Sequence, residues 1–383
     1  MASLADLKSN FSQLIASPSI SALEVEQDMS NQGVIDLLQT WFSELGFECK
    51  AQAVKDSRSK HNLVASFGSG KGGLLLAGHT DTVPFDEGRW SQDPFTLTEK
   101  DNRWYGLGTC DMKGFFALVL EALKDMPLAQ FKRPLHILAS ADEETTMNGA
   151  KAFAQQKSIA PDYAIIGEPT SLKPVYMHKG HLTQGIRVIG KSGHSSDPAK
   201  GVNAIEIMHL VMGQLLKLKQ HLADNYREEA FSVPYPTMNF GHVHGGDAAN
   251  RICGCCDLHI DIRPLPGLEL EILEQMVMNY LKPINDQYPG CINVAPLYPG
   301  SEPFADSREN SWSKLVAELS ANAPEVVNYA TEAPYISKLG CQTLVLGPGS
   351  IEQAHQPDEY LDTQYLNKTV ELLKQLIYHA CIK

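Results

Sequence analysis

The chain has 383 residues, and this length predicts two domains rather than a single core. Its composition, 43% hydrophobic and 20% charged, is typical of a globular protein, and its formal net charge is −13. The acidic balance argues against a general nucleic-acid binder, which needs a basic stripe. No apolar run approaches the ~18 residues of a transmembrane helix, so we expect neither nucleic acid nor a membrane as a partner.

The first residues, MASLADLKSN, lack the basic and then apolar pattern of a secretory signal, so we expect a cytoplasmic protein. A helix is expected at 33–45, where Gly46 ends it, and strands are expected at 47–54, 61–68 and 72–79. After them come a strand, turn and helix at 103–123, a strand at 134–144, a short helix at 148–156 and a strand at 162–169. Strands that alternate with helices predict an α/β sheet with parallel character.

The pattern changes near residue 175. The next predicted elements are an extended segment at 174–190, a long helix at 201–223, strands at 237–246 and 251–264, a helix at 267–287 and a strand at 291–299. This β-α-β-β-α-β order is typical of a ferredoxin-like α+β domain. Beyond it the α/β pattern returns, with a helix at 310–321, a strand at 342–350 and a helix at 365–382. The sequence therefore predicts an α/β domain of residues 1–177 and 297–383, interrupted by a ferredoxin-like domain at 178–296.

Three of the eight cysteines lie in RICGCCDLHIDIRP, within the inserted region. Alternation along this predicted strand places neighbouring residues on opposite faces. A reduced, packed thiol is therefore a better interpretation here than a metal ligand. The His242 and His244 pair in GHVHGGD also has metal-ligand spacing, but the sequence supplies no further ligand beside it, so we expect a structural or interface role.

Acidic and histidine side chains follow several of the predicted α/β strands at the point where each strand ends. They are His79, Asp81, Asp111, Asp142, Glu143, Glu144, Glu168 and, after the last strand, His355. Ligands of open α/β sheets gather outside the carboxyl ends of the strands. A lone histidine is usually structural. Several carboxylates at one edge of a sheet instead indicate a metal site, because carboxylates are rarely left near a core without partners.

Two imidazoles and three carboxylates suit Zn²⁺, and five ligands fit two ions that share a bridging carboxylate, ~3.5–4 Å apart. Asp111 is favoured as the bridge. Asp81, two residues after His79, is predicted to accept the other ring N–H of that histidine. Of Glu143 and Glu144, one can bind metal while the other acts as a general base toward water. Alternatively, both cap the helix that follows them.

The stretches GHTDTVP, GTCDMKG, ADEE, GEPT and AHQPDEY resemble the M20 metallopeptidase family. The family has a zinc-binding α/β domain with an inserted ferredoxin-like dimerisation domain. Longer stretches over nearly the whole chain, such as LLLAGHTDTVPFDEGRWSQDPF and KSGHSSDPAKGVNAIE, resemble its bacterial members that act on N2-acetyl-L-ornithine. The resemblance implies two zinc ions per subunit, which Co²⁺ can replace, and a homodimer. The choice among Zn²⁺, Co²⁺ and Mn²⁺ stays open.

The resemblance also implies a role for each site residue. His79 and Glu168 would hold one zinc, Glu144 and His355 the other, with Asp111 bridging, Glu143 as the base and Asp81 as the partner of His79. His194, in KSGHSS, matches a histidine of the inserted domain that reaches the partner subunit's site in related enzymes and stabilises the oxyanion there. A surface-loop histidine is the alternative for His194.

Three further residues are candidates for binding the substrate. Arg263 and Asn250 match substrate-contacting positions of related desuccinylases, and a guanidinium can grip a carboxylate through two hydrogen bonds. A surface position on a strand is the alternative for Arg263. Glu332 lies in YATEAPY, where desuccinylases typically have Gly-Gly-Thr-Ser. This departure suggests a different substrate tail and makes Glu332 a candidate partner for the ornithine ammonium.

The implied reaction is hydrolysis of N2-acetyl-L-ornithine to L-ornithine and acetate, a step of arginine biosynthesis. The alternatives within the family are a succinyl-diaminopimelate desuccinylase, a general N-acyl-amino-acid hydrolase and a dipeptidase. A non-catalytic binding protein is the alternative from another class. It is disfavoured because a binder has no use for a base such as Glu143 beside a complete ligand set.

Overall fold

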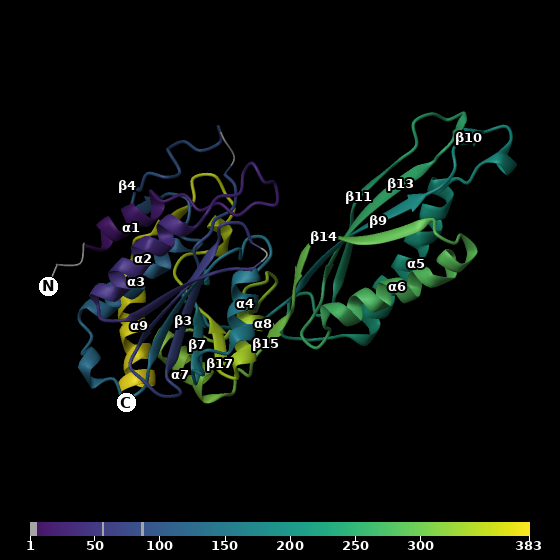
Figure 1. The fold of residues 1–383 in the computed structure, drawn as a ribbon. Helices are drawn as coiled ribbons and strands as arrows, with labels where there is room; N and C mark the ends of the chain where they lie inside the picture. Colours follow the sequence, from purple (N-terminus) through teal and green to yellow (C-terminus); the bar gives the residue numbers. More distant parts are fainter. Residues whose placement is uncertain (1–5, 56, 86–87) are drawn as a thin grey trace. The chain divides into compact units, whose positions relative to one another are not determined.

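The computed structural model describes residues 6–55, 57–85 and 88–383. The chain divides into two compact units (Figure 1). Unit 1 comprises Met1–Tyr176, Asp306–Glu325 and Thr331–Lys383, and unit 2 comprises Met177–Ala305 and Val326–Ala330. The predicted insertion at 178–296 falls inside unit 2. That unit extends to Ala305 and also includes the short later segment Val326–Ala330.

The larger sheet is mixed, with the strand order β1-β2-β6-β3-β7-β17-β8-β15 and β16 paired to β8, and its strands β1, β2, β6, β3, β7 and β17 lie in unit 1. The strands are β1 (Glu48–Ala53), β2 (His61–Phe67), β3 (Leu74–His79), β6 (Leu135–Ser140), β7 (Tyr163–Ile166), β8 (Val175–His178), β15 (Phe304–Ala305), β16 (Glu325–Val327) and β17 (Gln342–Val345). The central neighbours β6, β3, β7 and β17 are parallel, so their carboxyl ends share one edge. Every residue of β3 is buried, as expected for a parallel strand covered on both faces.

The helices of unit 1 are α1 (Leu7–Ile15), α2 (Gln32–Glu44), α3 (Lys113–Lys124), α4 (Asn148–Gln156), α7 (Ser311–Ser320), α8 (Ala333–Ile336) and α9 (Gln364–Ile377). Helix α3 packs against both α1 and α9, and α4 packs against α8. Gly46 has a φ of 87° just beyond the end of α2, the left-handed conformation that glycine adopts most easily. A separate small sheet holds β4 (Thr98–Lys100), β5 (Arg103–Tyr105) and β18 (Tyr360–Asp362).

Unit 2 is an antiparallel sheet of order β11-β13-β9-β14 with two long helices (Figure 1). Its elements are β9 (His181–Ile189), β10 (Gly193–His194), α5 (Ala204–Asn225), β11 (Thr237–Gly245), β12 (Arg251–Ile252), β13 (Cys255–Arg263), α6 (Leu270–Gln287) and β14 (Ile292–Ser301). The predicted β-α-β-β-α-β order is confirmed, and short β10 pairs with β12. Alternate residues of β13, among them Leu258 and Ile260, are buried in one core with α5 and α6, so the other face of the sheet stays open.

The thiols of β13 follow the predicted alternation. Cys256 is buried and Cys255 is exposed on the opposite face. All eight cysteines are free thiols. Within the described residues, no helix has the length and apolar character needed to cross a membrane. Taken together, the two sheets and their helices confirm the predicted fold class, an α/β domain with a second ferredoxin-like unit.

Candidate metal centre

The parallel strands of unit 1 bring together most of the side chains that the sequence singled out. β3 ends in His79, Glu143 and Glu144 follow β6, Glu168 follows β7, and His355 lies in the segment after β17. These positions share one edge because β6, β3, β7 and β17 run parallel. The sheet topology therefore accounts for four of the five predicted ligands.

Asp111 reaches the same place by a different route from the one predicted. The strand before it, β5, belongs to the small separate sheet, and Asp111 lies in the segment between β5 and α3. That segment is held by Glu359, whose Oε1 accepts the main-chain N–H groups of Cys110 at 2.8 Å and Asp111 at 3.0 Å. Both Glu359 oxygens also accept the N–H of Gly108. A carboxylate, rather than the sheet, positions Asp111.

Sequence reasoning missed Glu359, although it lies in the quoted stretch AHQPDEY. It is fully buried and comes four residues after His355. Glu359 therefore links the segment that carries His355 to the segment that carries Asp111. The sequence did offer one signal, because Glu359 is an acidic residue close to His355 to which no ligand role was assigned.

Asp111 lies between two histidines and faces each with a different oxygen. Its Oδ1 is 3.0 Å from Nε2 of His79, and its Oδ2 is 3.8 Å from Nε2 of His355. His79 Nε2 is also 3.9 Å from Oε1 of Glu168, and His355 Nε2 is 3.0 Å from Oε2 of Glu144. The five side chains thus form two histidine–glutamate pairs around one aspartate.

This donor set fits a metal centre. Two groups offer ligand atoms that all lie within 4.8 Å of one another: His79 with Glu143 and Glu168, and His79 with Asp111 and Glu144. Oε1 of Glu168 is buried and accepts no hydrogen bond from the described part of the chain, which leaves a lone pair free for a cation. Imidazole nitrogen and carboxylate oxygen are the ligands that Zn²⁺ takes in proteins.

The carboxylates that gather at this edge have shifted pKa values, because they are removed from water and lie close to one another. Burial, and then the charge of Glu168, raises the pKa of Glu143 well above its ordinary value. Burial and the charge of Asp111 likewise raise the pKa of Glu168. Burial alone would raise the pKa of Asp111, but the hydrogen bond and charge of His79 outweigh it and lower that pKa. The hydrogen bond to Glu144 raises the pKa of His355 to about 9. Such a cluster is compensated well by cations.

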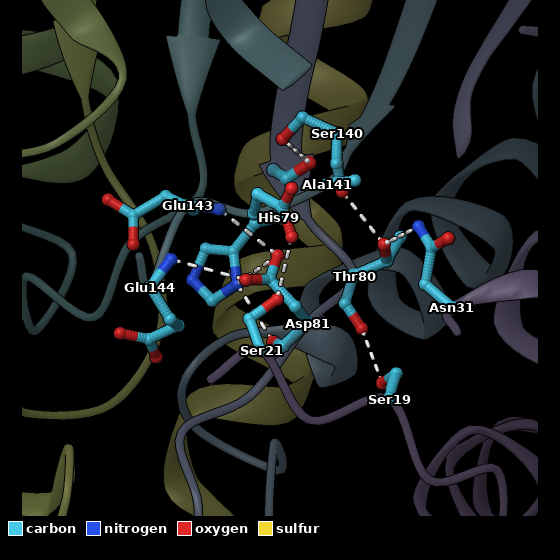
Figure 2. A network of polar contacts seen from close by, with 12 residues as sticks. Ser19, Ser21, Asn31, His79, Thr80, Asp81, Ser140, Ala141, Glu143 and Glu144 are labelled. Atoms are coloured by element: carbon cyan, nitrogen blue, oxygen red, sulfur yellow. Dashed lines mark hydrogen bonds and ion pairs between the residues drawn. The ribbon is translucent and has the colours of Figure 1, made fainter. Parts of the chain in front are cut away.

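Asp81 has a different contact from the one predicted for its carboxylate. Nδ1 of His79 is 3.0 Å from the main-chain oxygen of Asp81, while the carboxylate Oδ1 is 3.8 Å away. The carboxylate instead accepts the main-chain N–H of Glu143 at 3.3 Å and of Glu144 at 3.2 Å (Figure 2). Asp81 therefore orients the histidine through its backbone and the glutamate pair through its side chain. These contacts also show that Glu143 and Glu144 have a tertiary partner beyond any helix-capping role.

The turn after β3 is pinned from three sides (Figure 2). The Thr80 hydroxyl donates to the Ser140 carbonyl at 2.7 Å and accepts from the Asn31 amide at 2.8 Å. The hydroxyl of Ser19 donates to the Thr80 carbonyl at 2.7 Å. These buried hydrogen bonds hold Thr80, and with it the neighbouring His79 and Asp81, in place.

A buried lysine secures the residue before the glutamate pair. Lys60 is 1% exposed, and its Nζ lies 2.9 Å from Oδ1 of Asp28 and 3.5 Å from Oδ1 of Asp142. It also donates to the Ser21 hydroxyl at 2.9 Å. Asp142 has a φ of 60°, a left-handed conformation that needs such support. Sequence reasoning passed over Lys60 because nothing local links it to position 142.

Glu332 lies in unit 1, close to the carboxylate cluster. It is fully buried, and its charge contributes to the raised pKa values of Glu143 and Glu168. Burial raises the pKa of Glu332 itself to about 7. The nearby Ser140 hydroxyl, which partly offsets this rise in pKa, donates to the Gly78 carbonyl at 3.0 Å. Among the residues that the structure describes, no donor lies at hydrogen-bonding geometry to either Glu332 oxygen.

The remaining predicted residues lie in unit 2. His194 is exposed in β10, and its Nδ1 accepts the main-chain N–H of Ser196 at 3.2 Å and lies 2.8 Å from the Ser196 hydroxyl. The Asn250 carbonyl accepts the N–H of Ser195 at 3.1 Å, which makes Asn250 a neighbour of His194. Arg263 ends β13, and its Nε donates to Asp261 at 2.9 Å. Unit 2 thus brings His194 and Asn250 together, and the contact of these residues with a substrate stays a prediction.

Comparison with known proteins defines the class of this fold and site. Residues 75–379 match the model of the peptidase family M20/M25/M40, and the chain belongs to that family. The match confirms the predicted enzyme class, a metal-dependent hydrolase that acts on an amide bond.

Two curated relatives cover nearly the whole chain. The acetylornithine deacetylase of Erwinia tasmaniensis is 57% identical over 371 residues, 97% of each chain. The acetylornithine deacetylase of Salmonella arizonae is 56% identical over 368 residues, 96% of each chain. The likeness at this level runs through both units and is not confined to the metal-site motifs.

Solved structures show the same fold at low identity. An M20 family metallo-carboxypeptidase, Sso-CP2 of Sulfolobus solfataricus, has a TM-score of 0.77 at 17% identity, with 98% of this chain and 99% of that chain covered. The aminopeptidase PepT of Bacillus cereus has a TM-score of 0.74 at 21% identity and 98% coverage of each chain.

Proposed function

We propose that the chain is an acetylornithine deacetylase that hydrolyses N2-acetyl-L-ornithine to L-ornithine and acetate. The observation that carries the proposal is the identity of 55–57% to curated acetylornithine deacetylases over nearly the full chain. The site supports the same reaction, because the half-buried carboxylate of Glu143 lies beside His79 and Glu168 in a compact set of side chains that could hold a metal ion. We further propose that the enzyme is cytoplasmic and serves arginine biosynthesis.

In this proposal His79 and Glu168 hold one dication, His355 and Glu144 hold the other, and Asp111 bridges them. The proposed ions are Zn²⁺, with Co²⁺ as a substitute. Two bound dications supply polarisation of an amide carbonyl and acidification of water. The assignment rests on the two oxygens of Asp111, each of which faces a different histidine.

Glu143 is the proposed general base. It takes the proton of the attacking water and returns it to the departing α-amine, so the net reaction consumes one water. Asp81 accepts the main-chain N–H of Glu143 and so helps to position the side chain that transfers the proton.

His194 is the proposed donor to the developing oxyanion, and we propose that it acts in the active site of a second copy within a homodimer. Its ring is exposed, and the Ser196 hydroxyl contacts Nδ1, so Nε2 is the nitrogen available to a substrate. Loss of a well-placed oxyanion donor costs roughly 10²–10³ in kcat. His194→Ala should therefore lower kcat by about that factor while the zinc content is unchanged.

Three residues are proposed to select the substrate. Arg263 and Asn250 would bind the α-carboxylate, and Glu332 the side-chain ammonium. Glu332 is supported by its burial next to the catalytic carboxylates without a hydrogen-bond partner in the described chain, a charge that a substrate cation would compensate. Because its side chain is fully covered, this contact requires neighbouring side chains to move aside. Glu332→Gln should raise KM for acetylornithine and leave KM for N-acetyl-methionine unchanged.

The deciding experiment is a steady-state assay of released α-amine from the zinc-supplied enzyme. The panel is N2-acetyl-L-ornithine, N-succinyl-diaminopimelate, N-acetyl-methionine and a dipeptide, with Glu143→Ala as the blank. We expect the highest kcat/KM for acetylornithine. Comparable turnover of acetyl-methionine would indicate a general N-acyl-amino-acid hydrolase. Preference for the succinyl compound or the dipeptide would replace the proposal with a desuccinylase or dipeptidase. No turnover by a metal-loaded enzyme would reject it.

A further inference from the structure

The open face of the unit 2 sheet carries a group of three histidines that the metal centre does not use. His242 and His244 lie two residues apart on β11, the outer strand of the sheet, and both are exposed. His259 lies on the neighbouring strand β13, directly opposite His242 in the register. We call His242, His244 and His259 the β11/β13 histidine cluster.

The strand register is what assembles this cluster. Side chains two residues apart on one strand share a face, and directly opposite residues on paired strands have Cβ atoms about 4.5–5.5 Å apart. The ring centroids of His242 and His259 are 4.6 Å apart, and those of His242 and His244 are 6.4 Å apart. His242 therefore sits between the other two rings. From the sequence alone His242 and His244 lacked a third ligand, because His259 lies 15 residues beyond His244.

A carboxylate completes the grid. Asp257 is opposite His244 in the register, on the same face of β13 as His259. Its oxygens accept from Nε of Arg187 at 2.6 Å and Nη2 at 3.2 Å. The hydrogen bond from Arg187, with smaller contributions from His259 and His242, lowers the pKa of Asp257. Asp257 is therefore an ionised carboxylate paired with Arg187, and it lies beside the rings on the same face.

We propose that the β11/β13 histidine cluster binds one divalent transition-metal ion, with His242 as the central ligand. Imidazole is the preferred ligand of Zn²⁺, Ni²⁺ and Cu²⁺, whereas Mg²⁺ and Ca²⁺ prefer oxygen. The His242 ring is stacked on that of His244 and tilted against that of His259. Because His242 and His244 are exposed and His259 is half-buried, the rings can rotate so that their nitrogens face a common point. Three imidazoles supply three ligands of a tetrahedral site, and water can take the fourth position.

The test uses the full-length enzyme, saturated with Zn²⁺ and desalted so that the unit 1 centre is occupied. Ni²⁺ is then titrated at neutral pH by calorimetry into the wild type, His242→Ala, His244→Ala and His259→Ala. His209→Ala is the matched control, because His209 is an exposed histidine of α5 in the same unit. The expected result is one additional Ni²⁺ per chain in the wild type and in the control.

The three variants should differ in a defined order. His242→Ala removes the ring that neighbours both others and should weaken Ni²⁺ binding most. His244→Ala and His259→Ala each leave one close pair and should weaken it less, by roughly tenfold, a change that even an indirect partner of a metal ligand can produce. The kcat of all three should match the wild type, since none belongs to the proposed catalytic machinery. This readout also confirms that the variants are folded.

Two outcomes would overturn the proposal. One is a wild type that binds no Ni²⁺ and that also holds no more zinc per chain than His242→Ala. The other is His242→Ala that binds Ni²⁺ as tightly as His209→Ala, which would place the ion elsewhere. Neither outcome bears on the deacetylase proposal, because that proposal is tested by amide hydrolysis and not by binding at unit 2.

Discussion

The two sheets of the molecule present their ionisable side chains in opposite ways. In unit 1, parallel strands end at one edge, and buried carboxylates converge there from separate loops. In unit 2, antiparallel strands line up histidines and carboxylates in register on a face that stays open. Burial of like charges raises the pKa of Glu143, whereas the exposed partner Arg187 lowers that of Asp257. Convergence with burial therefore leaves carboxylates that need cations, whereas on the open face the carboxylate of Asp257 is already paired with Arg187.

The sharpest test of the buried edge is Glu143→Gln, which keeps the shape of the side chain and removes its charge. Loss of a general base costs roughly 10²–10⁴ in rate, so kcat should fall by about that factor while metal content per chain stays constant. Steady-state kinetics measures kcat, and inductively coupled plasma mass spectrometry measures the metal content per chain. A variant that also loses metal would instead make Glu143 a ligand, as its place beside His79 and Glu168 permits.

The buried ion pairs behind the edge should matter more for stability than pairs on a surface. Lys60→Met leaves Asp28 and Asp142 without their cation, and breaking a buried pair from one side costs about 3 kcal/mol or more of unfolding free energy. Urea unfolding measures the change. Lys50→Met is the matched control, because Lys50 and Glu48 form an exposed pair. Equal midpoints for the two variants would contradict the structural role of Lys60.

Glu359→Gln tests whether a carboxylate outside the ligand set positions Asp111. The amide offers only one oxygen to the main-chain N–H groups of Gly108, Cys110 and Asp111, and turns a donor toward them. Metal affinity should weaken by roughly 10–100-fold with KM little changed, as for other partners of metal ligands. Competition with a chelator measures it. Glu352→Gln, on the same segment, should bind metal like the wild type.

The smallest expected effect concerns an isolated buried imidazole. Burial lowers the pKa of His136 to about 4 from an ordinary 6.5. The unfolded chain therefore takes up this proton first, and stability falls as pH drops from 6.5 toward 4. The loss is about 1 kcal/mol by pH 5.5. His136→Gln should remove that part of the acid loss in urea unfolding at pH 7 and 5.5, and a variant with the same pH dependence as the wild type would contradict it.

Several features were predictable because they depend on short stretches of chain. Each of His79, Glu143 and Glu168 follows a recognisable apolar run, and the shared edge of parallel strands then brings them together. The β-α-β-β-α-β order of unit 2 was likewise predictable from the sequence. Apolar residues recur every three or four positions in a helix and every second position in a strand, so a short stretch distinguishes the two.

Other features were not predictable, because they depend on contacts between distant segments. The carboxylate of Asp81 was expected to orient His79, yet its oxygens accept the N–H groups of Glu143 and Glu144, more than 60 positions along the chain. Asp111 was expected at the end of a sheet strand, yet a carboxylate almost 250 positions later holds its segment. No local pattern encodes which backbone groups such a side chain will meet.

By itself, then, the sequence determined the kinds of element, their order, the candidate ligands and the family. These follow from hydrophobic periodicity and from motifs read within about ten residues. Only the tertiary structure decided the clamp of Glu359 on Asp111, the support of Asp142 by Lys60 and the meeting of His242 with His259. The physical reason is that strand register and buried hydrogen bonds are set by how the whole chain packs, and not by the residues adjacent to them.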